Sequence, residues 1–133
     1  MLLVRTVISV LCAVGFYASV FMLSKSVRAA RGMLAEPSVV QTERASLFFG
    51  TPNSLIGLVY YTALAAVSWW AHHTFLLALA LAAAAFAAAT SLYLAYSLLF
   101  VTRRSCPYCW AAHAVNWALL AAVPWLLVLH ART

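Results

Sequence analysis

The sequence Arg103-Arg-Ser-Cys-Pro-Tyr-Cys-Trp-Ala-Ala-His113 joins a C-x-x-C pair to an apolar run that continues to Leu129. This junction predicts that Cys106 and Cys109 lie at the start of a hydrophobic helix. Pro107 suits the first helical position, because the first N–H groups of a helix have no internal partner. Cys106 then falls at or near the N-cap, where the free amides and the positive end of the helix dipole favour the thiolate.

Cys109 follows Cys106 by three residues, so the two sulfurs share one helix face. One thiol can attack an external disulfide while the other resolves it, which favours redox chemistry. A soft metal held by Cys106, Cys109 and His113 is the alternative, although tetrahedral zinc needs a fourth ligand and none is near in the sequence. Haem attachment is excluded, because Trp110 and not histidine follows Cys109.

The composition predicts an integral membrane protein. The 133 residues are 67% hydrophobic and only 8% charged, whereas about a quarter of the residues in a soluble domain are charged. A helix that crosses the hydrocarbon core needs about 20 apolar residues. We therefore expect an all-α protein, a bundle of four transmembrane helices that forms a single domain over residues 1–133, with spans at about 2–23, 54–71, 75–101 and 107–130.

The connection between the first two spans is the only long polar one. Lys25, Arg28 and Arg31 recur at helical spacing, which predicts a short interfacial helix from Lys25 to Leu34 at the level of the lipid headgroups. Farther on, the apolar stretch at 45–50 is expected to turn back towards the membrane. The formal charge of +6 fits anionic lipid as a partner, and no motif indicates nucleic acid.

The side of the membrane that the C-x-x-C faces stays open at this stage. Six Lys and Arg residues flank the end of the bundle with the long loop and the C-x-x-C, against two at the other end. The positive-inside rule therefore places the C-x-x-C in the cytoplasm. Disulfide chemistry belongs mainly to oxidising compartments, which favours the opposite side.

Two motifs together resemble the vitamin K epoxide reductase family. The first is Phe49-Gly-Thr-Pro-Asn-Ser-Leu-Ile-Gly57 with Tyr60 and Tyr61, at the start of the second span, and the second is the C-x-x-C at the start of the fourth. The resemblance covers about residues 48–117. It implies a four-helix membrane enzyme that couples thiol–disulfide exchange to reduction of a quinone of the menaquinone, ubiquinone or vitamin K type. A thioredoxin-like protein would be the thiol partner, and the bacterial inner membrane the expected location.

The resemblance also implies roles for individual residues. Cys109 matches the cysteine beside the quinone, and Cys106 its outward-facing partner. Asn53 matches an asparagine that hydrogen-bonds one quinone carbonyl, although it could also be only a helix cap. His113 stands where the family often has a tyrosine that bonds the other carbonyl. Ile56 and Tyr60 would line the pocket for the ring.

The sequence departs from the family in the loop after the first span. The family usually has two further cysteines there, which relay electrons to the C-x-x-C, whereas residues 24–53 contain none. The third cysteine, Cys12, lies in the first span, and a free cysteine there commonly behaves as a small buried hydrophobic residue. Either a partner protein reaches Cys106 directly, or this member of the family has left the relay reaction.

Overall fold

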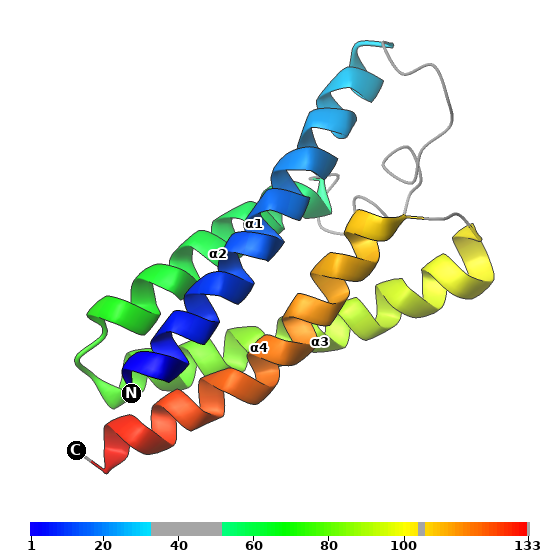
Figure 1. The fold of residues 1–133 in the computed structure, drawn as a ribbon. Coiled ribbons are helices and arrows are strands. Elements are labelled where there is room, and N and C mark those ends of the chain that lie inside the picture. The colour runs from blue at the N-terminus through cyan, green and yellow to red at the C-terminus, as the bar shows by residue number, and fades with distance from the viewer. Residues whose placement is uncertain (33–51, 104–105, 133) are drawn as a thin grey trace.

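The computed structural model describes residues 1–32, 52–103 and 106–132 (Figure 1). Their regular structure is helical throughout, so the all-α expectation is confirmed. The helices are α1 (Leu2–Ala30), α2 (Asn53–Trp70), α3 (Thr74–Tyr96), the π-helix η3 (Ser97–Thr102) that continues α3, and α4 (Pro107–Ala131).

Within the described residues, three helical segments are long and apolar enough to cross a membrane: α1, residues 74–101 and α4. The protein is therefore an integral membrane protein. The predicted second span does not reach the same apolarity, because α2 begins with Asn53 and Ser54 and also carries two tyrosines and two tryptophans in its 18 residues. Length and composition thus support three of the four expected spans.

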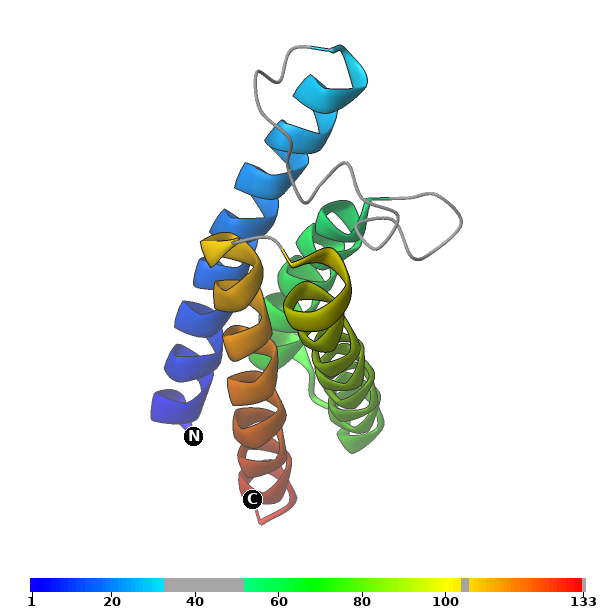
Figure 2. The same cartoon turned by 90° about the vertical axis from the view of Figure 1, so that its right-hand side faces the viewer.

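The helices run lengthwise through the molecule, from one end to the other (Figures 1 and 2). Both termini lie at one end, and the end of α1 lies at the other with the starts of α2 and α4. α1 packs against α2 and α4, and α3 packs against α4, while α2 and α3 make few contacts although only residues 71–73 separate them in the chain. From that link α2 and α3 spread apart (Figure 1).

The first helix corrects one prediction. α1 continues without a break to Ala30, so residues 25–30 are the last turns of the first helix and do not form a separate helix. The physical reason is that no glycine or proline lies between residue 23 and Gly32. There φ is 69°, a conformation that glycine adopts at no steric cost, and the Gly32 amide donates to the Ala29 carbonyl at 3.0 Å.

The stretch at 45–50 that was expected to approach the membrane lies outside the described residues, as does the start of the motif at Phe49.

Small side chains let α3 approach α4 closely. Trp117 on α4 donates its ring N–H to the Ala88 carbonyl of α3 at 3.3 Å, and small residues at membrane helix interfaces favour such close packing. The buried face of α3 consists mainly of alanine and serine: Ala80, Ala84, Ala88, Ser91 and Ala95. The antiparallel register that this contact sets places the C-terminal end of α3 beside the C-x-x-C.

Candidate active site

The two cysteines of the C-x-x-C form a disulfide at the start of α4. Cys106 is the N-cap residue and Pro107 the first residue of the helix, as predicted from the sequence. The backbone N–H of Cys109 donates to Cys106 Sγ at 3.2 Å. The helix start therefore holds the pair in the geometry that a dithiol–disulfide couple needs, with Cα atoms 5.2 Å apart.

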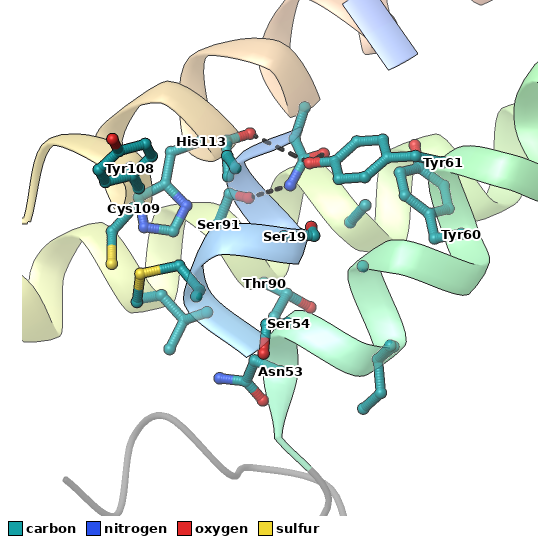
Figure 3. A pocket seen from close by; sticks show the side chains of 18 of the residues that line it. Ser19, Asn53, Ser54, Tyr60, Tyr61, Thr90, Ser91, Tyr108, Cys109 and His113 are labelled. Carbon is teal, nitrogen blue, oxygen red and sulfur yellow. Dashed lines mark hydrogen bonds between the residues drawn. The ribbon is translucent and has the colours of Figure 1, made fainter. Parts of the chain in front are cut away.

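A cavity of about 280 Å³ lies between the four helices below this disulfide (Figure 3). Most of its wall is apolar, and each of the four helices contributes to it. The structure brings together here Cys109 and all four residues expected to contact a quinone: Asn53, Ile56, Tyr60 and His113. Cys106 is not among the residues that line the cavity, so the two cysteines differ in what they face.

Asn53 is not the N-cap that the sequence allowed. α2 begins at Asn53, and its N-cap is Pro52, which makes no side-chain cap bond. The motif Thr-Pro-Asn-Ser suggested a capping role because asparagine and serine are good N-caps, but the fixed φ of proline suits the cap position equally well here. The Asn53 side chain instead lines the cavity.

A polar network crosses the cavity wall and was missed from the sequence. Tyr61 on α2 donates its hydroxyl to Asn116 Oδ1 on α4 at 2.7 Å, and Asn116 Nδ2 donates to Ser91 Oγ on α3 at 2.6 Å (Figure 3). Polar groups within a membrane helix are costly unless paired, and they commonly mark functional positions. An asparagine two helical turns after Cys109, on the same face, was the available signal.

Tyr61 is positioned by a glycine on α1. A Cβ atom built on Gly15 would lie 2.5 Å from Tyr61 Cζ, so only glycine allows the ring to reach Asn116. We expect Gly15→Ala to displace the ring and lower the free energy of unfolding by about 1–3 kcal/mol, measured by thermal unfolding in detergent.

Gly57→Ala is the matched control for this change. Its Cβ would meet the hydroxyl of Ser19 at 2.9 Å, and a serine hydroxyl can rotate away more easily than a buried ring. An equal loss of stability in the two variants would contradict the positioning role of Gly15.

Three buried polar atoms at the cavity have no hydrogen-bond partner: Tyr60 Oη, Ser97 Oγ and His113 Nδ1. Among the described residues only one other atom, Arg5 Nε, shares this state, and Arg5 is not one of the residues that line the cavity. An unpaired buried polar group costs about 1–3 kcal/mol. Three of the four unpartnered atoms thus belong to residues that line one cavity.

His113 is held between aromatic rings. It is buried, and its ring centroid lies 5.9 Å from that of Trp110 and 6.2 Å from that of Trp117. This packing fixes the imidazole one helical turn after Cys109, on the same face of α4. A group bound beside the Cys109 sulfur therefore comes within reach of the His113 ring.

The outer side of the disulfide is covered by α1. Cys106 is only 6% exposed, and its sulfur lies 3.9 Å from Met22 Sδ. Next to it the ring of Phe21 stacks on Tyr108 at 3.9 Å between centroids, with Lys25 Nζ 5.1 Å from the Phe21 centroid. Cys106 is thus not itself a residue that lines the cavity, and α1 covers it at Met22.

The other expectations concern Cys12 and a bound metal. Cys12 is a free cysteine in the hydrophobic core, 3% exposed, as expected for a small buried hydrophobic residue. In the part of the chain that the structure describes, no three His, Cys, Asp or Glu side chains come together as metal ligands. The alternative of a soft metal at Cys106, Cys109 and His113 therefore gains no support.

The chain thus combines apolar membrane helices with a C-x-x-C disulfide beside an internal cavity. The model of the vitamin K epoxide reductase family matches residues 6–123. The chain therefore belongs to this family, and family membership supports a membrane redox enzyme of the vitamin K epoxide reductase type. No curated protein shows significant similarity to the chain.

Proposed function

We propose that this protein is a quinone-linked thiol–disulfide oxidoreductase, which takes electrons from a thioredoxin-like dithiol and passes them to a membrane quinone. One observation carries the proposal: Cys109 lines a largely apolar cavity together with three residues that each carry a buried polar atom without a partner. A quinone head group supplies what such a cavity lacks, since it combines a flat apolar ring with carbonyl oxygens that accept hydrogen bonds.

In the proposed reaction Asn53 and His113 each donate a hydrogen bond to one carbonyl oxygen, while Ile56 and Tyr60 contact the ring. Negative charge develops on these oxygens during reduction, and fixed donors in a dry site stabilise it. The Cys109 thiolate attacks the ring, and Cys106 then displaces it to form the disulfide. The dithiol loses two electrons and two protons, and the quinone gains both to become the quinol.

A quinone can enter this cavity from the lipid between α2 and α3. These helices spread apart and make few contacts, and two residues that line the cavity are exposed at its edge, Ile56 at 37% and Phe86 at 62%. An isoprenoid tail can lie in such a gap while the head group is inside. We propose that α2 also crosses the bilayer, because its 18 residues span about 27 Å of a core about 30 Å thick.

Electrons enter through Cys106 in this scheme, because no loop cysteine is present to relay them. The partner dithiol attacks Cys106 Sγ, and the last turns of α1 must move aside to expose it. The expected location is the bacterial inner membrane, with lipid around the exposed apolar faces of α1 and α3.

The aromatic contact between α1 and Tyr108, next to the disulfide, gives a prediction. Phe21→Ala removes the ring stacked on Tyr108 and should speed reduction of the disulfide by a thioredoxin about 2- to 12-fold, since such a ring pair contributes about 0.5–1.5 kcal/mol. The rate is followed by alkylation of the thiols that appear. Phe16→Ala, at an exposed position on the same helix, is the control, and an equal acceleration there would refute the covering role of Phe21.

A turnover assay tests the proposed function itself. Purified protein in detergent receives a reduced thioredoxin and a short-tail quinone without oxygen, and quinol formation is followed by absorbance. We expect one quinol for each dithiol oxidised, and no catalysis by the double variant Cys106→Ala, Cys109→Ala. Equal rates for the wild type and the double variant would disprove the proposal.

A further inference from the structure

Ser97 carries a buried hydroxyl for which the proposed reaction has no use. The residue is 1% exposed, lines the cavity, and its Oγ has no hydrogen-bond partner. It is the first residue of the π-helix η3, which continues α3 at its C-terminal end. A serine or threonine hydroxyl in a helix can donate to the carbonyl one turn earlier, as Thr90 does to Phe86. The Ser97 hydroxyl makes no such bond.

The register of α3 against α4 places Ser97 at the level of the reactive cysteine. Asn116 bonds Ser91, and Trp117 bonds the Ala88 carbonyl, so the two helices run antiparallel with these residues side by side. Six residues farther along α3, about 9 Å, Ser97 comes level with the first turn of α4, which contains Cys109. Ser97 is therefore at the end of the cavity where the ring is reduced.

The cavity offers more hydrogen-bonding groups than two carbonyl oxygens can use. Asn53 and His113 serve the carbonyls in the proposed reaction. Of the buried polar atoms without a partner at the cavity, this leaves the hydroxyls of Ser97 and Tyr60. A naphthoquinone presents only C–H groups on its second ring. A dimethoxybenzoquinone places two ether oxygens between its carbonyl oxygens along one edge of the ring, and carries the isoprenoid tail on the other edge.

We infer that Ser97 donates a hydrogen bond to a methoxy oxygen of the substrate, so that the cavity selects a methoxy-substituted benzoquinone over a naphthoquinone. This inference rests on the proposed function and adds the class of quinone to it. Ser97 acts as a specificity-determining residue, because the methoxy oxygen is not itself reduced. A naphthoquinone in the same place leaves the Ser97 hydroxyl unpaired, and the loss appears as weaker binding.

Equilibrium binding tests the inference separately from turnover. The oxidised protein in detergent is titrated with a dimethoxybenzoquinone and with a naphthoquinone, each with one isoprenoid unit. Quenching of tryptophan fluorescence reports binding, since Trp110 and Trp117 flank His113. We expect the wild type to bind the benzoquinone about fivefold more tightly, the net effect of one neutral hydrogen bond. Ser97→Ala should remove this preference, and Ser97→Thr, which keeps a hydroxyl, should retain it.

Ser68→Ala is the matched control, because Ser68 is buried on α2, bonds the Ala65 carbonyl and does not line the cavity. It should leave the preference unchanged. An equal preference in the wild type and Ser97→Ala, or a wild type that prefers the naphthoquinone, would overturn the inference. Selective binding with no quinol formed in the turnover assay would support the role of Ser97 and refute the proposed reaction, and failure to bind either quinone would overturn both.

Discussion

We expect Cys109→Ala to lower the turnover of quinone reduction by about 10³-fold or more, because it removes the thiol that passes electrons to the ring. Removal of a nucleophile from an enzyme commonly has an effect of this size. Cys109 is the cysteine of the pair that lines the cavity, so no other thiol can replace it at the ring. The measurement is quinol formation with a thioredoxin as reductant.

Two further cysteine variants separate the roles in this experiment. Cys106→Ala should also stop turnover, because no disulfide can form, yet its Cys109 thiolate should still change the absorption spectrum of an added quinone through direct contact. Cys12→Ala removes the third cysteine, which lies in the hydrophobic core, and should keep its activity. Full activity in Cys109→Ala would refute the assigned role.

His113→Leu is expected to lower kcat/KM by about 10²- to 10³-fold, the usual effect of removing one donor that stabilises a developing oxyanion. The leucine keeps apolar bulk between the tryptophan rings but cannot donate a hydrogen bond. The free energy of unfolding should stay equal or rise, because the substitution removes a buried Nδ1 that has no partner. Loss of activity without loss of stability would show that His113 acts in the reaction and is not needed for the fold.

His113→Tyr gives the rescue for this variant, since a tyrosine hydroxyl can donate the same bond, and it should recover part of the activity. His73→Leu, at an exposed position in the link between α2 and α3, should have no effect. A His113→Leu enzyme within about twofold of the wild type would show that the imidazole does not stabilise the reduced ring.

The helix boundaries near the C-x-x-C could be predicted because local physics sets them. Pro107 can occupy only the first turn without loss of a hydrogen bond, so Cys106 had to lie at the N-cap, where the structure has it. The end of α1 was harder to predict. The positive charges at Lys25 and Arg28 suggested that the chain leaves the membrane there, but charged residues do not end a helix. Gly32 was the true signal.

The cavity could not be predicted from the sequence, because it depends on which helices pack against one another. The residues expected to bind quinone were proposed from the family motifs, and the structure places all of them around one space. The bonds of Asn116 could not be predicted, because its two partners, Tyr61 and Ser91, lie 55 and 25 residues away. Likewise, nothing in the sequence marks Ser97 as a candidate site residue, because its missing hydrogen-bond partner is visible only in the structure.

A single turnover tests the central claim most directly. The protein is reduced fully, freed of reductant and mixed with a short-tail quinone without oxygen, after which free thiols are counted by alkylation and mass spectrometry. Of the three cysteines, we predict that only Cys12 remains free and that one quinol forms per protein molecule. Three free thiols with no quinol formed would contradict the account.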